Sequence, residues 1–482
     1  MVEIIPFKAL RFNTLKNEEI SNLVSPPYDI ISPVQKENLK TFSENNIIRL
    51  ILPEDNDNIN KYESAKNILT SWIDNNILTI ENGEALYIFE ESFLDNGEWK
   101  NFTAFIGLTK IEEYESSKIL RHEYTLSKPK EDRLNLLKAT NTNFGLIYTL
   151  YNDQNRKVQK ILNKYKSEKP FYDFIPKYSY ELRFKVWKII NITDINEIIQ
   201  LMKDKNLLIA DGHHRYETSR LFKHEIKAKR EKDKNNFKKT FIKSTQSYIF
   251  PEDYVLTMYV NFNQENIKIL PTHRLIKFEK NINLENIKKE LSNFFNIDNY
   301  CDLFNDKLNN ELVNYKDKNS LKNFDLTERI KDKIILNISN FMKKSKEDSK
   351  KCFCFYSKGP DYSKDPDIFF CTLKKEINCI YTNLNENELE FEKLDVRILH
   401  KLIIENYLDK YKIKNIDYTH SLSEIVDKIS IKTGEYDLGI ILNAPEIKDV
   451  ESLSLKGKVM PQKSTYFYPK PCSGLIMYKM NL

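Results

Sequence analysis

Apolar positions along the chain switch between the two-residue period of strands and the longer period of helices. Aromatic and β-branched residues fill 84–94 and 102–114, and the turn sequence DNGEWKN separates them, which predicts an antiparallel hairpin. An apolar run at 46–53 predicts another strand, and the residues that follow the double proline of SPPYD predict a helix over 33–41. The first part of the chain therefore predicts strands and helices in one architecture.

The same alternation continues to the end of the chain. Residues 254–262 predict a core strand, and residues 278–350 predict mainly amphipathic helix joined by polar loops. Strand patterns at 352–357 and 367–373 then precede a helix around 394–408. We therefore expect α/β alternation in the C-terminal part as well.

The chain is longer than one hydrophobic core usually supports. At 482 residues, we expect two or three domains of mixed α/β (α+β) class. The composition shifts along the sequence suggest four consecutive parts: an N-terminal α/β part at 1–151, a central part at 152–277, a mainly helical segment at 278–350 and a C-terminal α/β part at 351–482.

Composition indicates a compact cytoplasmic protein. Hydrophobic residues make up 40% of the chain, and the net charge of +5 comes from 75 basic and 70 acidic residues, a balance that does not by itself indicate nucleic-acid binding. No segment approaches the ~20 apolar residues that cross a bilayer, and the first residues lack the apolar core of a signal peptide. The 6 cysteines contain no CxxC pair, so we expect reduced thiols.

The segment LLIADGHHRY is the best candidate for an anion-binding site. Its apolar residues predict a buried strand and the residues after Gly212 predict a helix, so Gly212 would lie in a strand-to-helix turn. Backbone N–H groups at a helix start attract phosphate, and neighbouring side chains would add donors: His213, His214 and Arg215. Asp211 would orient a histidine or hold a metal that bridges to phosphate.

The alternative is a structural turn, because Asp-Gly is common in turns and an arginine often makes a structural ion pair. We place a zinc-type metal site below phosphate binding, since adjacent His213 and His214 project differently from a helix and do not form the i, i+4 pair of HExxH.

Two constellations in the first part could assist. The motif RHEYT contains Arg121, His122 and Glu123, and Arg133 follows twelve positions after Arg121. The basic residues could bind a charged ligand, and His122 or Glu123 could transfer a proton. The alternative for Arg133 is the solvated face of an ordinary amphipathic helix. In PPYD, Asp29 stands in a stiff turn that would position a general base, or it is simply a helix cap.

Two basic segments have competing interpretations. Lys463, with Ser464 and Thr465 beside it, would neutralise and donate to a phosphate, although a tight turn before two final strands accounts for the same residues. The lysine-rich residues 223–245 lack interleaved aromatics, so we favour a solvated helix extension or mobile insertion over a nucleic-acid arm.

Six motifs occur in a fixed order: SPPYDIIS, RHEYT with DRLNLLKAT, IADGHHRYET, LPTHRLI, LDVRILH and MPQKSTYFYPKPCSGLI. In this order they closely resemble the prokaryotic family called domain of unknown function 1015, over residues 5 to about 480. The lysine-rich run resembles an insertion relative to typical members. The family name implies no activity.

The GHHRY turn is also similar, more distantly, to the phosphate-binding segment of the ParB and sulfiredoxin superfamily, which includes free-serine kinases. The PPYD turn and the helix after it resemble the first motif of ParB-like domains. This resemblance implies a nucleotide-binding core and phosphorylation of a small hydroxyl compound, with free L-serine as one acceptor, ATP or ADP as donor and Mg²⁺ as cofactor. It implies Asp29 or Glu123 as base. The implied phosphate-binding residues are Asp211, Gly212, His213, His214 and Arg215, and the residues implied around the transferred group are Arg121, His122, Arg133 and Lys463.

Three other classes stay open at the level of sequence. A nucleotide-binding regulator would use the same turn without an acceptor, and a phosphatase or nucleotide hydrolase would release phosphate without one. A ParB-like DNA-binding protein ranks last, because no basic recognition helix follows residue 278. A P-loop or protein kinase is disfavoured, since the chain has 10 glycines and no Walker A sequence.

Overall fold

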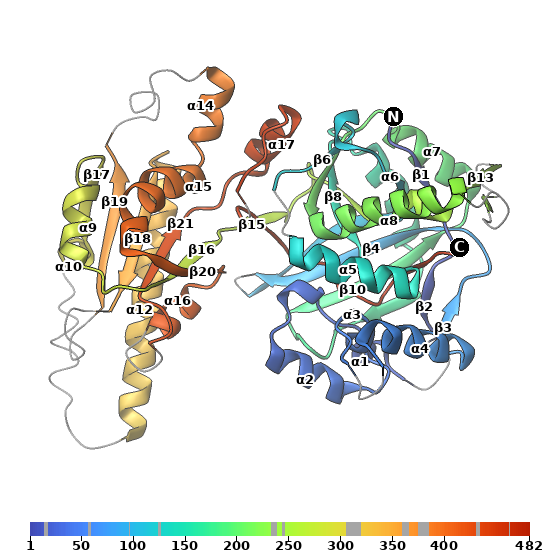
Figure 1. Cartoon of the computed structure of the whole chain (residues 1–482), viewed down its shortest axis with the longest axis horizontal. Coiled ribbons are helices and arrows are strands. Elements are labelled where there is room, and N and C mark those ends of the chain that lie inside the picture. Colours follow the sequence, from blue (N-terminus) through green and yellow to red (C-terminus); the bar gives the residue numbers. More distant parts are fainter. Residues whose placement is uncertain are drawn as a thin grey trace. The chain divides into compact units, whose positions relative to one another are not determined.

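The computed structural model describes twelve stretches of the chain: residues 1–13, 18–55, 59–95, 97–123, 127–232, 239–242, 246–304, 320–358, 366–374, 385–429, 434–461 and 463–482. They form two compact units (Figure 1). Residues 1–268 and 467–482 make the first unit, and residues 269–466 make the second. The four parts suggested by sequence stay a prediction.

A mixed sheet lies at the centre of the first unit. Its described strands follow the order β6-β11-β8-β14-β5-β4-β10-β9, and β1 pairs with β5 beside the end of β4. The bounds are β1 Ile4–Ile5, β4 Leu86–Asp95, β5 Glu98–Lys110, β6 Ile119–Leu120, β8 Ile147–Tyr151, β9 Tyr172–Phe174, β10 Leu182–Ile189, β11 Leu207–Asp211 and β14 Tyr254–Asn261.

Apolar residues cover both faces of this sheet. On one face, strand residues such as Leu86, Ile88 and Ile209 pack against α6 (Lys157–Lys166), α7 (Ile192–Met202) and α8 (His213–Lys232). Figure 1 shows α8 crossing the sheet on this side. The opposite face is aromatic, with ring pairs Phe89–Phe184, Phe102–Tyr148 and Phe93–Tyr468.

The remaining elements of the first unit are short. The helices are α1 Ile20–Leu23, α2 Pro33–Phe42, α3 Ile48–Ile51, α4 Lys61–Asp74 and α5 Ser127–Thr140, with single 3₁₀ turns at Tyr28–Ile30, Tyr114–Ser116 and Pro251–Asp253. The strands are β2 Leu10–Phe12, β3 Leu78–Ile80, β7 Thr142–Asn143, β12 Thr240–Ile242, β13 Ser247–Ile249 and β23 Tyr478–Lys479.

Several predicted elements are confirmed. Strands β4 and β5 pair antiparallel from Tyr87–Ile106 to Asp95–Glu98, as the alternating pattern predicts. Helix α2 follows the double-proline segment and begins with a capping box between Ser32 and Gln35. The lysine-rich run continues α8 to Lys232, as a helix extension would, and its residues 233–238 and 243–245 lie outside the described residues.

The strand predicted at 46–53 is wrong, because Ile48–Ile51 form helix α3. A short apolar run fits a buried helix as well as a strand. The buried side chain of Asn46 decides between them. Its Oδ1 accepts from the Ile48 N–H at 2.9 Å, and its Nδ2 donates to the Asn22 carbonyl at 2.7 Å, which starts a helical turn and ties it to the neighbouring segment.

The second unit is built on an antiparallel sheet whose described strands follow the order β17-β19-β18-β21-β16-β20. The strand β17 lies inside 278–350, so that segment is not only helix and loop. The strands are β16 His273–Phe278, β17 Phe295–Asn299, β18 Cys352–Ser357, β19 Asp367–Leu373, β20 Ile413–Thr419 and β21 Leu438–Leu442. The helices are α9 Leu284–Leu291, α10 Tyr300–Phe304, α12 Ser320–Glu347, α14 Glu386–Glu392, α15 Asp395–Ile398, a π-helical continuation at Leu399–Leu408, a 3₁₀ turn at Asp409–Tyr411, α16 Leu422–Ile429 and α17 Ile447–Leu455.

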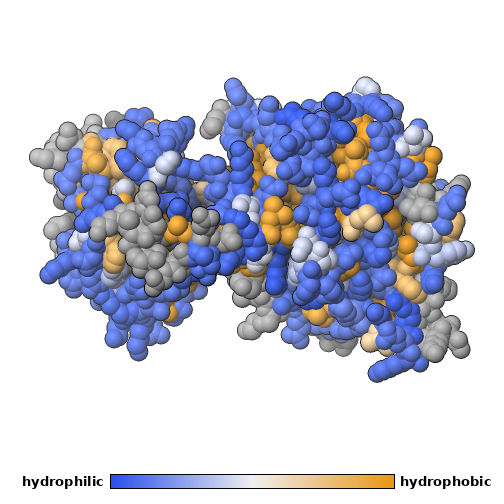
Figure 2. Space-filling view, turned by 90° about the horizontal axis from the view of Figure 1, so that it is seen from above, coloured by the Kyte–Doolittle hydropathy of each residue, from blue (hydrophilic) through white to orange (hydrophobic). Residues whose placement is uncertain are grey.

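The chain leaves the first unit along β15 (Lys268–Leu270) and returns along β22 (Tyr466–Tyr468). In the view of Figure 2 the surface is mostly hydrophilic, and apolar residues gather only in small separate patches. Among the helices that the structure describes, none is both long enough and apolar enough to cross a membrane.

Candidate functional site

The DGHHR segment forms the predicted strand-to-helix turn. Strand β11 ends at Asp211, Gly212 has a φ of +94°, and α8 begins at His213, with the Tyr216 N–H donating to the Gly212 carbonyl at 2.9 Å. A Cβ at position 212 would stand 3.1 Å from Nε of Arg215. Glycine is therefore needed here both for its backbone conformation and for the space that Arg215 takes.

Asp211 is the centre of a charged cluster. Its carboxylate accepts a hydrogen bond from Arg215 and, through Oδ1, another from Nζ of Lys470 at 2.5 Å. Lys470 Nζ also lies 3.4 Å from Oδ2 of Asp29, and the Lys470 side chain is only 8% exposed. One ammonium therefore joins the PPYD turn to the DGHHR turn.

Sequence reasoning missed Lys470, and its selection of Lys463 stays a prediction. Lys463 belongs to the second unit and has a φ of +58°, and the neighbouring Ser464 donates to the Pro461 carbonyl at 2.6 Å, which is turn geometry. Lys470 stands between Pro469 and Pro471, and this stiff flanking backbone was the available signal for a precisely held side chain.

Two histidines meet on the other side of the turn. Nδ1 of His122 lies 2.8 Å from the Ile209 carbonyl, which only accepts, so Nδ1 carries the proton and Nε2 is left as an acceptor. Nε2 lies 3.7 Å from Oε1 of Glu123, and the ring centroids of His122 and His213 are 4.6 Å apart. Burial lowers the pKa of His122, so the neutral ring predominates at pH 7.

His213 is nine-tenths buried, and its Nε2 has no hydrogen-bond partner among the described residues. Burial lowers the pKa of His213 far below its ordinary value, and the positive charges of Lys470 and Arg121 lower it further. A buried polar atom without a partner costs free energy unless a ligand or water satisfies it. Arg121 itself stacks on Tyr114, with its guanidinium carbon 4.5 Å from the ring centroid.

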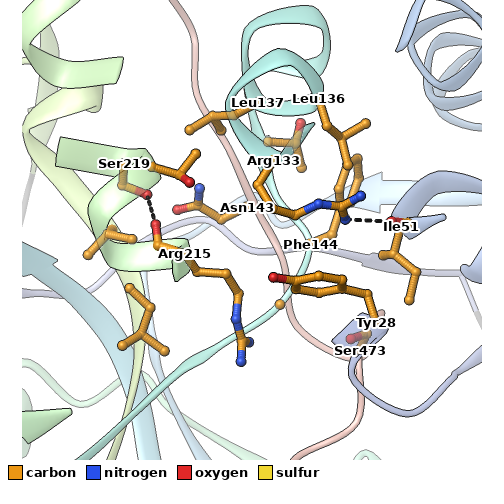
Figure 3. Close-up of a pocket in the computed structure, with 15 residues that line it drawn as sticks. Tyr28, Ile51, Arg133, Leu136, Leu137, Asn143, Phe144, Arg215, Ser219 and Ser473 are labelled. Carbon is orange, nitrogen blue, oxygen red and sulfur yellow. Dashed lines mark hydrogen bonds between the residues drawn. The ribbon is translucent and has the colours of Figure 1, made fainter. Parts of the chain in front are cut away.

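Arg133 and Arg215 line one small cavity of about 70 Å³, with Tyr28 lying between their side chains (Figure 3). Arg133 is 10% exposed rather than solvated, donates to the Ile51 carbonyl at 2.6 Å and stacks on Tyr28 at 4.3 Å. Burial and the charge of Asp29 raise the pKa of Tyr28 to about 12. A cavity of this size holds only a few water molecules.

A further buried acid lies close to the cluster. Glu91 of β4 is fully buried, neither carboxyl oxygen has a partner among the described residues, and burial raises its pKa well above the ordinary value. The charges of Glu91 and Asp211 add to burial in raising the pKa of Tyr148, so this phenol lies within electrostatic reach of both acids. Sequence reasoning missed Glu91, although the alternation of Phe89, Glu91 and Phe93 places it on an inward face.

The cluster is compatible with magnesium that arrives on a nucleotide. Magnesium is usually held by one or two carboxylates together with substrate phosphates, and Asp29 and Asp211 offer two converging carboxylates. Groups of three or more histidine, cysteine or acidic side chains that could hold a metal alone are absent from the part of the chain that the structure describes.

Replacing Gly212 by alanine tests the turn, and Gly97→Ala is a matched control. Both glycines have positive φ, at +94° and +82°, but a Cβ at position 97 would meet nothing within 4 Å. We expect each variant to lose about 1–2 kcal/mol of unfolding free energy, since both residues become strained. Only Gly212→Ala should also weaken ligand binding, measured by calorimetric titration with ADP. Equal ADP affinities of the two variants would argue against a role for the turn in binding.

Solved structures similar to this chain share little sequence with it. A conserved hypothetical protein from Pyrococcus furiosus is 12% identical, with 74% of this chain and 88% of that chain covered and a TM-score of 0.27. A free serine kinase in complex with AMP is 12% identical, with 76% and 88% covered and a TM-score of 0.29. SbnI with a C-terminal truncation, from Staphylococcus aureus, is 8% identical, with 77% and 86% covered and a TM-score of 0.31. Among curated proteins, none matches the chain.

One protein-family model matches most of the sequence, over residues 4–396. The match contains the PPYD, RHEYT, DGHHR and LPTHRLI motifs. The last motif, MPQKSTYFYPKPCSGLI, follows residue 396 and lies outside the match, so its part in the resemblance stays a prediction. The match spans more than half of the sequence, and the chain belongs to the family described as "Protein of unknown function (DUF1015)".

Proposed function

We propose that this protein is a nucleotide-dependent phosphotransferase that acts on a small hydroxyl compound, with free L-serine as the first acceptor to test. The observation that carries the proposal is the convergence of Asp29 and Lys470 on the Gly212 turn. It combines phosphate-binding groups with a carboxylate that is available as a base.

The turn has the properties of a phosphate site. Helix α8 is 20 residues long, and the first turn of such a helix directs N–H groups and a positive dipole end toward its N-terminus. The unpartnered Nε2 of His213 adds a buried group that a phosphate oxygen would satisfy. The cations Arg215 and Lys470 are both held within hydrogen-bonding distance of Asp211, so they are already concentrated where the phosphates would lie.

Asp29 is our candidate for the base. Its side chain is 26% exposed, so an acceptor can reach it, while Lys470 holds it next to the turn. In the transfer, the acceptor oxygen forms a bond to the terminal phosphorus, the bond from that phosphorus to the nucleotide breaks, and the acceptor proton passes to Asp29. Bound magnesium would neutralise phosphate charge. Glu123, with His122 beside it, is the second candidate for the base.

The deciding experiment incubates the protein with magnesium and ATP or ADP, with and without L-serine. Phosphoserine and nucleotide consumption are followed by mass spectrometry, in the wild type and in Asp29→Asn and Glu123→Gln variants. We expect serine-dependent phosphoserine that falls at least a hundredfold in Asp29→Asn, because removal of a general base typically costs 10²–10⁴ in rate.

Other outcomes would separate the alternative functions. Nucleotide binding with no turnover for any small alcohol would favour a regulatory nucleotide-binding protein. Release of inorganic phosphate without an acceptor would favour a hydrolase. Absence of nucleotide binding would contradict the proposal and leave the DGHHR segment as a structural turn.

A further inference from the structure

The position of Lys470 is fixed by its surroundings. Two residues after Pro471, the backbone of Ser473 pairs with that of Ser25, with the Ser473 N–H donating to the Ser25 carbonyl at 2.8 Å and the reverse bond at 3.3 Å. This pairing holds the C-terminal segment against the residues that lead into PPYD. The backbone beside Lys470 is therefore fixed by hydrogen bonds, and it places the Lys470 ammonium between Asp29 and Asp211.

The Lys470 ammonium lies between the carboxylates of Asp29 and Asp211. Its Nζ lies 2.5 Å from Oδ1 of Asp211 and 3.4 Å from Oδ2 of Asp29, so one cation pairs with two carboxylates. Together with Arg215, which bonds to Asp211, the cluster has two positive and two negative charges. Phosphate would add negative charge and compete for the ammonium, which is a strong point-charge partner for phosphate. The carboxylates would then need another cation.

We propose that Lys470 holds the place of a divalent cation between Asp29 and Asp211 in the resting protein, and that it moves to the phosphates when a magnesium nucleotide binds. The proposal rests on the proposed function, because a phosphate must arrive to draw the ammonium away. It makes Lys470 a positioning residue whose release couples metal binding to nucleotide binding.

A second observation points to a ligand at the same place. The buried Nε2 of His213 has no partner among the described residues, and the charge of Lys470 is one of those that lower the pKa of His213, so the two side chains lie within electrostatic reach of each other. A phosphate over the turn would meet His213 and the released ammonium together. The coupling is reciprocal, so the metal should bind poorly without nucleotide and the nucleotide poorly without metal.

The test removes the ammonium and measures metal alone. Mn²⁺, which takes oxygen ligands as Mg²⁺ does, is titrated without nucleotide and followed by electron paramagnetic resonance, in wild type and in Lys470→Met. We expect Lys470→Met to bind one Mn²⁺ at least fivefold more tightly than the wild type, and Lys470→Met with Asp211→Asn to lose this gain. Lys479→Met is the matched control, because Lys479 is a partly buried lysine of the same segment, and it donates to the Thr140 carbonyl at 3.1 Å.

The inference would be overturned if Lys470→Met bound Mn²⁺ no more tightly than the wild type and Lys479→Met. It would also be overturned if the gain in Mn²⁺ affinity persisted after Asp211→Asn was added. If Lys470→Met does not fold, the inference is tested by the ADP affinity of a variant that keeps Lys470. Asp29→Asn should weaken ADP binding with magnesium present and should not weaken it with a chelator, and equal losses in both conditions would overturn the inference. The Mn²⁺ titration contains no nucleotide, so it tests the cation site separately from the proposed function. If the wild type bound no ADP and Lys470→Met still gained Mn²⁺ affinity, the proposed function would be contradicted and the cation site would be supported.

Discussion

Arg215→Ala is expected to weaken nucleotide binding at least tenfold, about 1.4 kcal/mol. The guanidinium lies over Gly212, donates to Asp211 and to the Leu146 carbonyl, and is 16% exposed. Its loss removes a cation from the turn, and with it part of the positive charge that offsets the Asp211 carboxylate near the phosphates. Binding is measured by calorimetric titration with ADP and magnesium at 25 °C.

Stability must be measured on the same variant, because Arg215 also makes structural hydrogen bonds. Removal of hydrogen bonds from a charged group costs about 1.5–3 kcal/mol, so Arg215→Ala should be destabilised and still folded. Arg183→Ala is the control, since that arginine pairs with Asp173 on the surface, with 47% of its side chain exposed. An ADP affinity that is unchanged per folded molecule of Arg215→Ala would make Arg215 purely structural.

Local patterns were sufficient for elements whose contacts are local. The β4–β5 hairpin follows from alternation around a turn sequence, and the β11–Gly212–α8 turn follows from an apolar run that ends in Asp-Gly. The α3 helix did not follow, because its apolar residues satisfy either period and the choice depends on Asn46 contacting Asn22, 24 positions away. Tertiary hydrogen bonds therefore decided what periodicity left ambiguous.

The candidate site likewise combines residues that are close in the sequence with residues that only the fold brings together. Asp211, Gly212 and Arg215 are close in sequence, so one motif was enough to propose them together. Lys470 is 259 positions from Asp211, and the prolines beside it indicate a held side chain without indicating the turn to which that side chain returns. Lys463 had the more obvious polar context, because Ser464 and Thr465 follow it, and its part in the site stays a prediction.

Glu91→Gln is expected to stabilise the first unit at neutral pH. Both carboxyl oxygens of Glu91 are buried without a partner among the described residues, and burial raises the pKa, so the folded protein keeps a proton that the unfolded chain releases near pH 4.3. The stability contributed by this proton is present below that pH and is lost as pH rises toward the folded pKa. Relative to the variant, the wild type should lose about 1.4 kcal/mol per pH unit in that window.

The measurement is urea unfolding at pH 5 and pH 7, followed by tryptophan fluorescence. All 3 tryptophans, Trp72, Trp99 and Trp187, belong to the first unit, so the signal reports its unfolding. Glu98→Gln on the exposed end of β5 is the control, and it should differ from the wild type by the same amount at both pH values. A Glu91→Gln variant whose difference from the wild type also stayed constant would mean that Glu91 is ionised in the folded protein. A bound cation or ordered water would then have to satisfy its carboxylate, because an ionised carboxylate without partners is too costly to bury.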